Sequence, residues 1–132
     1  MTVKLIYRGE PHVVLSVSEN AGNAMLDAIT RLMDNGHIEI LSGADALIAT
    51  LHLSSPAAQT ATDGEIELNP IRPGIAVTGG QAATARVVGA AGAEVFLCDV
   101  GDMSSDAVIK LSTTQIRQGE PVRIHSFVLS MP

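Results

Sequence analysis

The chain has 132 residues, of which 46% are hydrophobic and 17% charged, with a mean hydropathy of +0.30. This balance excludes intrinsic disorder, and the length favours a single domain over 1–132, because each half would be too small to bury a useful core. Eight basic and fourteen acidic residues give a net charge of -6. The basic residues of the second half are scattered singly, which argues against a nucleic-acid partner.

Several function classes are disfavoured by what the chain lacks. No apolar stretch approaches the roughly 20 residues that span a bilayer, so we expect no membrane partner. Residues 1–10 show no signal-peptide pattern, and Cys98 is the one cysteine, so we expect cytoplasmic synthesis without an internal disulfide. Aromatic residues make up 2% of the chain, which leaves little for the stacking platforms of sugar or single-strand nucleic-acid binders.

Residues 1–17 are predicted to form an N-terminal β-hairpin. Val3, Leu5 and Tyr7 occupy every second position, which is typical of a strand, and the segment 8–11 contains Gly and Pro, which are typical of a turn. Residues 13–17 follow and are rich in β-branched side chains, which favour a strand.

One α-helix is predicted at about residues 20–35. Apolar side chains recur there at spacings of three and four, which predicts one face packed on the core. Ser18 or Asn20 is expected to cap the start, and Gly36 is expected to end the helix in the left-handed conformation. The apolar face comprises Ala21, Ala24, Met25, Ala28, Ile29, Leu32 and Met33.

The rest of the chain is predicted to be β-rich. The small, polar stretch 54–63 is typical of an exposed loop. Eight or nine short strands at regular spacing with one helix favour a mainly β, jelly-roll-like β-sandwich over 18–132, preceded by the hairpin. The expected strands are 37–41, 46–53, 65–68, 75–78, 83–88, 94–100, 107–111 and 122–129.

The sequence motifs predict no catalytic, cofactor-binding or metal-ligating residues. The glycines at 79–80 and 89–92 lack the Lys-Ser/Thr of a phosphate-binding loop and are interpreted as turns. Cys98 lies in an apolar strand with little positive charge nearby, and is expected to be a buried small hydrophobe. The histidines lack the local spacing of a metal site; they are His12, His37, His52 and His125.

The acidic residues also predict no metal site. Asp99, Asp102 and Asp106 lack the ligand spacing and the closing Glu of a calcium loop, so a solvated turn is preferred. Paired carboxylates that meet only in the fold stay open, although the sequence as a whole predicts a protein that is not an enzyme.

Three predicted strand regions carry apolar residues on both faces, more than a small sandwich can bury alone. They are 13–17, 46–53 and 122–129. Such strands are either central in a sheet or face another subunit, which favours oligomerisation or docking on a large partner.

The order of elements resembles a family of small tailed-bacteriophage virion structural proteins. The resemblance is carried by residues 23–30, 35–43 and 47–57, which correspond to the helix and first two strands of that family, and it extends over about residues 20 to 130. It departs from the family at Ala85-Arg86-Val87, where members commonly carry a Trp-Phe-Arg-like triplet, and in the additional residues 1–17.

The resemblance implies a head decoration or cement protein on the capsid exterior, synthesised in the host cytoplasm. Its expected partners are the major capsid protein and other copies of itself, as a homodimer or homotrimer, and residues 1–17 are a candidate docking arm. A tail or adaptor component, a host-surface or glycan-binding module and an enzyme of unknown type remain as alternatives.

Overall fold

The structure is a computed structural model that describes residues 18–130, so the predicted N-terminal hairpin and docking arm lie outside the described residues. Within that range the chain forms one α-helix followed by ten strands, and the prediction of a mainly β fold with one helix is confirmed. The elements in chain order are α1 (Glu19–Met33), β1 (His37–Ser42), β2 (Leu47–His52), β3 (Glu65–Glu67), β4 (Gly74–Ile75), β5 (Gly80–Val88), β6 (Glu94–Gly101), β7 (Ile109–Leu111), β8 (Gln115–Ile116), β9 (Pro121–Val122) and β10 (Ile124–Ser130).

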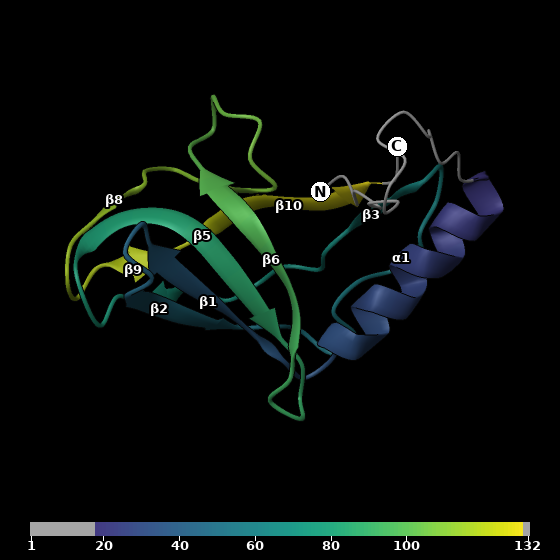
Figure 1. Cartoon of the computed structure of the whole chain (residues 1–132), viewed down its shortest axis with the longest axis horizontal. Coiled ribbons are helices and arrows are strands. Elements are labelled where there is room, and N and C mark those ends of the chain that lie inside the picture. Colours follow the sequence, from purple (N-terminus) through teal and green to yellow (C-terminus); the bar gives the residue numbers. More distant parts are fainter. Residues whose placement is uncertain (1–17, 131–132) are drawn as a thin grey trace, which may run out of the picture.

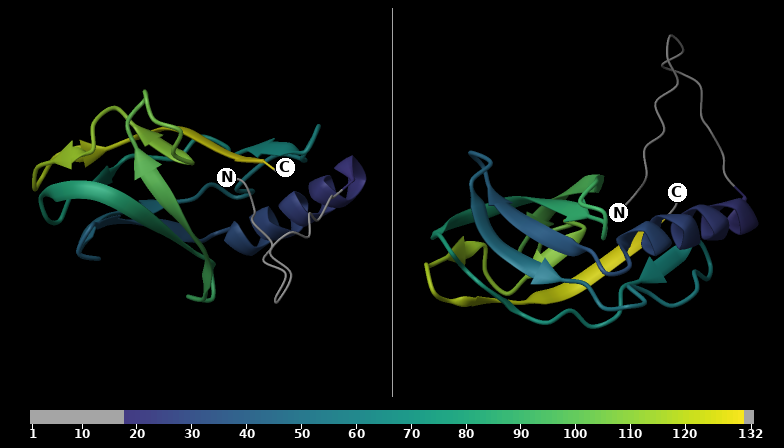
Figure 2. Two further views of the ribbon diagram at one scale, coloured as in Figure 1. Left: turned by 45° about the horizontal axis from the view of Figure 1, so that its top comes forward. Right: turned by 90° about the horizontal axis from the view of Figure 1, so that it is seen from below.

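Most of the strands belong to one curled sheet in the order β2-β1-β5-β6-β7-β10-β3, with β8 paired to β5. All neighbours are antiparallel except β6 and β7. The long strands β5 and β6 bend strongly, so the two halves of the sheet face each other across a core, as in a sandwich (Figures 1 and 2). Helix α1 lies at one end of the sheet, next to β3, and the short ribbon β4–β9 lies at the other (Figure 1).

The β4–β9 ribbon covers the outer edge of β2. The Val77 N–H donates to the Ile48 carbonyl oxygen at 2.7 Å, which continues the hydrogen bonding beyond the last strand of the sheet. Gly74 packs directly on this edge, because a Cβ atom there would lie 2.4 Å from the Thr50 carbonyl oxygen. An exposed sheet edge is a template for unwanted strand pairing, and the ribbon removes most of this one.

The core between the curled halves is almost entirely aliphatic, as the low aromatic content requires. Phe127 is buried in it, and the partly buried Phe96 packs against Phe127 edge to face, with ring centroids 6.3 Å apart. The largest fully buried side chains are those of Leu26, Met33, Ile38, Ile40, Ile48, Leu51, Val87, Ile109, Leu111 and Leu129.

The ends of α1 differ partly from the prediction. Ser18 is the N-cap, as one of the two predicted candidates, and its hydroxyl oxygen accepts from the Ala21 N–H at 3.2 Å. The left-handed residue after the helix is Asn35, with φ 61°, and the prediction of Gly36 there was wrong. Gly36 is needed for another reason: a Cβ atom at that position would lie 2.0 Å from the Val88 carbonyl oxygen.

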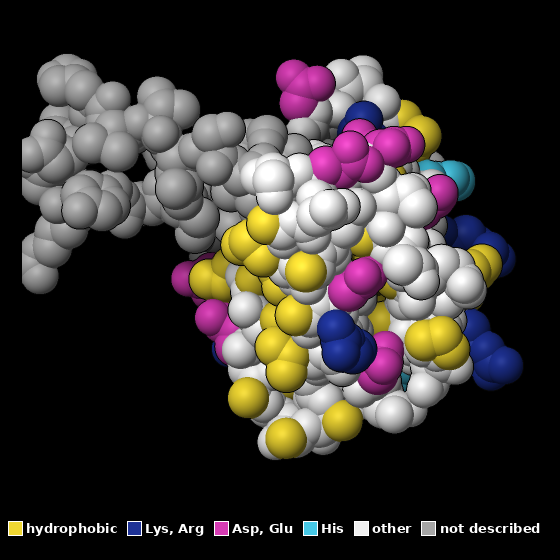
Figure 3. Space-filling view, turned by 90° about the vertical axis from the view of Figure 1, so that its right-hand side faces the viewer, with side chains coloured by type: hydrophobic (Ala, Val, Ile, Leu, Met, Phe, Trp, Pro, Cys, Tyr) yellow, Lys and Arg dark blue, Asp and Glu magenta, His cyan; other side chains and the backbone are white. Residues whose placement is uncertain are grey.

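The predicted core-facing side of α1 was also wrong for most of its residues. The buried residues are Gly22, Leu26, Thr30 and Met33, whereas Leu32 is 63% exposed. Thr30 can be buried because its hydroxyl donates to the Leu26 carbonyl oxygen. The alanines of the predicted face are exposed as well; they are Ala21, Ala24 and Ala28. Figure 3, which faces the helix end of the molecule, shows a band of hydrophobic side chains at its surface.

The strand predictions are mostly confirmed. The expected strand 75–78 is an exception, because only Ile75 of it lies in a strand, β4. Strand β8 was not predicted, and the expected strand 122–129 is broken at Arg123 into β9 and β10. The segment 54–63 is not simply exposed, since Ala57 and Ala61 are buried within it. The N–H groups of these two alanines donate hydrogen bonds to the carboxylates of Asp34 and Asp27.

Candidate functional site

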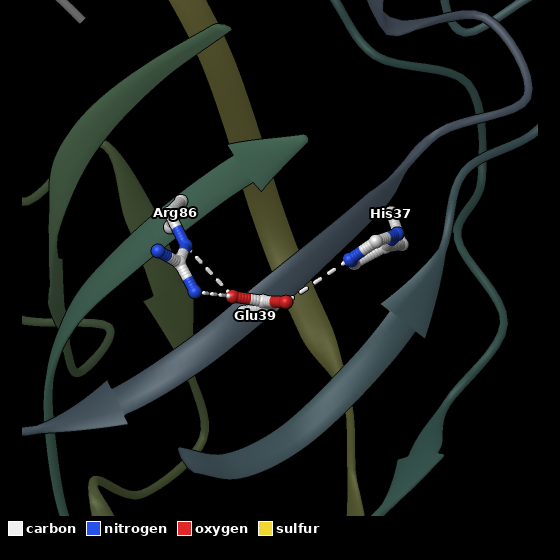
Figure 4. A network of polar contacts seen from close by, with 3 residues as sticks. All are labelled: His37, Glu39 and Arg86. Carbon is white, nitrogen blue, oxygen red and sulfur yellow. Dashed lines mark hydrogen bonds and ion pairs between the residues drawn. The ribbon is translucent and has the colours of Figure 1, made fainter. Parts of the chain in front are cut away.

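A charged network lies on the outer face of the sheet, on β1 and β5. His37 and Glu39 are two residues apart in β1 and therefore point to the same face. Arg86 is the register partner of Glu39 on β5. The Arg86 Nε donates to Glu39 Oε1 at 2.7 Å, its Nη2 donates to the same oxygen, and His37 Nε2 lies 3.1 Å from Glu39 Oε2 (Figure 4).

The network holds Glu39 as a carboxylate. Burial alone would raise the pKa of Glu39, but the hydrogen bonds from Arg86 and His37, together with their charges, hold this pKa below its ordinary value. The Glu39 hydrogen bond and charge in turn raise the pKa of Arg86. Both oxygens of Glu39 are engaged, so the carboxylate is a structural acceptor rather than a free base.

A cavity of about 220 Å³ borders this network and is closed on one side by the β5–β6 turn. Its lining residues are His37, Glu39, Arg86, Val88, Gly92 and Glu94. The His52 ring lies edge to face with that of His37, at 6.2 Å between centroids. No set of three or more His, Cys, Asp or Glu residues within 18–130 is arranged to hold a metal ion.

A second polar site joins α1 to the segment 54–64. Asp34 Oδ1 accepts from the Ala57 N–H at 2.7 Å, and Asp27 Oδ1 accepts from the Ala61 N–H at 2.8 Å. Farther along, Asn23 Oδ1 accepts from the Gly64 N–H at 2.9 Å. We call these three bonds the helix clamps. They satisfy backbone donors of a segment that has little regular structure of its own.

The helix clamps border a groove of about 480 Å³ between α1 and residues 56–60. Its lining includes the two clamp carboxylates and the guanidinium of Arg31, which donates to the Asp27 carbonyl oxygen at 3.2 Å. The groove is shallow and its charged groups already serve the fold, so its geometry indicates a stabilising role.

The outer surface of the β4–β9 ribbon is apolar and flanked by arginines. Gly74 and Val122 are paired and buried, whereas Ile75 and Pro121 are paired and exposed. Ile75 and Val77 lie two residues apart on the same side, and each is 59% exposed. Three exposed arginines precede or follow the ribbon strands; they are Arg72, Arg117 and Arg123. We call the exposed residues of this surface the ribbon face: Arg72, Ile75, Val77, Arg117, Pro121 and Arg123.

The remaining residues singled out in the sequence each have separate partners. Cys98 is buried on β6, and desolvation raises the pKa of its thiol to about 12, so it has almost no thiolate at neutral pH. Asp102 accepts from the Ser104 hydroxyl and N–H in the β6–β7 turn, and these bonds lower its pKa. Asp99 Oδ1 instead accepts from the Val108 N–H at 2.9 Å. His125 lies exposed on β10, away from β1.

The sequence analysis missed both polar sites. The His37-x-Glu39 spacing on a predicted strand was a usable signal for a same-face pair, but only the β1–β5 register identifies Arg86 as the partner. The positions of Asn23, Asp27 and Asp34 beside the buried helix face were a signal for the helix clamps. Their partners are backbone N–H groups, which no side-chain motif reveals.

Comparisons with protein-family models, with curated proteins and with solved structures find no match for this chain. Among the described residues, the one helix is too short and too polar to cross a membrane.

Proposed function

We propose that this protein is a tailed-phage virion structural protein, a head decoration or cement protein that docks on the exterior of the capsid through its ribbon face. The observation that carries the proposal is the exposed, arginine-flanked apolar surface of the β4–β9 ribbon. The resemblance of residues 23–57 to the opening of a phage virion protein family supplies the biological setting.

The chemistry of the ribbon face suits a folded, acidic partner surface. Exposed Ile75 and Val77 offer apolar area at the centre of the patch, and arginine is enriched at protein interfaces, where its planar guanidinium pairs with carboxylates. Arg117 is 89% exposed and lies 4.0 Å from Glu120, a distance at which an exposed ion pair contributes little. Its charge is therefore available to a partner.

The rigidity of the ribbon also suits docking on a capsid lattice. It lies on a ribbon held from both sides, because Val77 bonds to β2 and the Ala76 N–H donates to the Glu120 carbonyl oxygen at 2.8 Å. A rigid surface loses little conformational entropy on docking. A protein that binds the folded lattice but not unfolded subunits stabilises that lattice by mass action.

Self-association as a dimer or trimer is part of the same proposal, since repeated copies on a lattice meet at symmetry axes. The mass of the purified protein in light scattering tests it directly. A tail or adaptor component would use the same ribbon face, but on a few copies per particle.

The first experiment is quantitative mass spectrometry of purified phage particles separated into heads and tails. A simple ratio of this chain to the major capsid protein, confined to heads, is the expected result. A few copies travelling with tails would establish the tail or adaptor alternative instead. Absence from both fractions would overturn the virion proposal.

The second experiment tests the ribbon face with a matched control. The double substitution Ile75→Asp/Val77→Asp places charges on the docking patch, and Leu97→Asp makes the same change at a 52% exposed position on β6. We expect the double variant to lose at least tenfold in capsid occupancy, while Leu97→Asp binds normally and both proteins stay folded. Equal binding by all three proteins would exclude the ribbon face as the docking surface.

A further inference from the structure

Helix α1 carries an apolar surface that the core uses only at its border. Six apolar side chains line one side of the helix over almost its full length, and the alanines and Leu32 among them are exposed. We call this surface the α1 stripe: Ala21, Ala24, Met25, Ala28, Ile29 and Leu32. At 1.5 Å per residue, the stripe runs from Ala21 to Leu32 over about 17 Å of the helix.

The other sides of α1 are already occupied. Leu26 and Met33 face the core, and α1 contacts β3 and β6. The flank with Asp27 and Asp34 is bonded to the segment 54–64 by the helix clamps. Ile29 lies at the border of the stripe and packs partly against the core, whereas Ala21, Ala24, Ala28 and Leu32 are exposed and point away from both the core and the helix clamps. A contiguous apolar helix face of this kind marks an interaction site.

From the position, reach and charge of the residues that precede α1, we propose that residues 1–17 of the same chain cover the α1 stripe. They join α1 directly at its N-cap, Ser18, without an intervening linker. Seventeen extended residues reach about 56 Å, which is enough to turn back and run along the whole stripe. Such a short connection keeps the segment at an effective concentration in the millimolar range.

The sequence of 1–17 complements the stripe in pattern. Val3, Leu5 and Tyr7 alternate in its first half and Val13, Leu15 and Val17 in its second, so each half offers one apolar side in an extended conformation. The three alanines of the stripe have small side chains, which let a second backbone approach the helix closely.

Charge favours this segment over a second copy of α1. Residues 1–17 carry Lys4 and Arg8 against Glu10. Helix α1 and its cap carry Glu19, Asp27 and Asp34 against Arg31. Asp27 and Asp34 lie on the clamp flank, so their charges act on an occupant of the stripe from a distance. The net negative helix attracts the net positive segment 1–17 and repels a second copy of α1.

Hydrogen–deuterium exchange of the full chain tests the contact. We expect the backbone amides of residues 1–17 to exchange at least tenfold more slowly than unstructured peptide, and to lose that protection in Ala24→Glu/Ala28→Glu. Both alanines are exposed, so the core should stay folded, as circular dichroism can confirm. Ala44→Glu, in the exposed turn before β2, is the control and should leave exchange unchanged. Unprotected amides in the wild-type protein, or protection that survives Ala24→Glu/Ala28→Glu, would overturn the proposal.

Disulfide trapping identifies which chain covers the stripe. In a Cys98→Ala background, Ala28→Cys is combined in turn with a cysteine at Leu5, Tyr7, Val13 or Leu15. Cross-linked monomers, formed at least tenfold faster than with Ala90→Cys in the β5–β6 turn, are the expected result. Cross-linked dimers would assign the stripe to a second copy, and no cross-link in any of the four pairs would refute the assignment to residues 1–17.

Discussion

The helix clamp at Asp34 provides a quantitative test of how α1 stabilises the segment 54–64. Its Oδ1 accepts from the N–H of Ala57, whose residue is 1% exposed. In Asp34→Ala this donor keeps its burial but loses its acceptor. A hydrogen bond to a charged group contributes about 1.5–3 kcal/mol, and a buried donor without a partner costs about 1–3 kcal/mol.

An opposing effect reduces the expected loss. Asp34 is the C-cap of α1, where a negative charge is unfavourable to the helix dipole by about 0.3–1 kcal/mol. We therefore expect Asp34→Ala to lower the free energy of unfolding by about 1–2.5 kcal/mol. Asp34→Asn keeps an oxygen acceptor and removes the charge, so it should stay within about 0.5–1 kcal/mol of the wild type.

Urea titration followed by circular dichroism measures both variants, and thermal melts should show roughly 3–5 °C per kcal/mol for a chain of this size. Hydrogen exchange at Ala57 gives the local readout, with faster exchange in Asp34→Ala alone. The reasoning fails if Asp34→Ala is as stable as the wild type, or if Asp34→Asn is as destabilised as Asp34→Ala. Because Asp27 binds the same segment, Asp27→Ala/Asp34→Ala should be non-additive by at least about 0.5 kcal/mol.

Three further predictions follow from other parts of the fold. The folded-state pKa of Glu39 is lowered, so its contribution to stability is present above the ordinary pKa of a glutamate and is lost as the pH falls through the folded-state value. Glu39→Gln should therefore flatten the acid limb of the stability–pH curve, and an unchanged limb would contradict the network with Arg86. Gly36→Ala should destabilise the protein by at least about 3 kcal/mol, because its Cβ atom would lie 2.0 Å from a carbonyl oxygen. Gly43→Ala, where a Cβ atom would have no neighbour within 4 Å, should be neutral in the same denaturation assay. Similar effects of the two substitutions would argue against this close approach. Cys98, with a pKa of about 12, should react with a thiol reagent only at the rate of unfolding, and rapid labelling of the native protein would show the residue to be accessible.

Local patterns in the sequence carry much of the secondary structure. The alternation in 37–41 and 46–53 predicts β1 and β2, because residues two apart share one face of a strand. The N-cap Ser18 is likewise readable, since its hydroxyl bonds to an N–H only three residues away. These features depend only on residues close together in the chain, so the sequence is enough to predict them.

Which side of the helix is buried, and which side chains pair, depends on contacts between residues far apart in the sequence. The apolar periodicity of α1 predicted a helix correctly but not which side is buried, because two apolar flanks were present and the choice was made by Leu26 and Met33 packing on the sheet. Arg86 became the partner of Glu39 through strand register, across 47 positions of sequence. The buried alanines of 54–63 depend on carboxylates of α1, which supply acceptors to backbone donors that carry no sequence signature.

The division therefore has a physical cause. The sequence by itself determined composition, a mainly β architecture, the helix and most strand positions, since these follow from local propensity and periodicity. Only the tertiary structure decided which faces stay exposed, and with them the ribbon face and the α1 stripe. Exposure is a property of what packs against a surface, and the packing partners here lie far away along the chain.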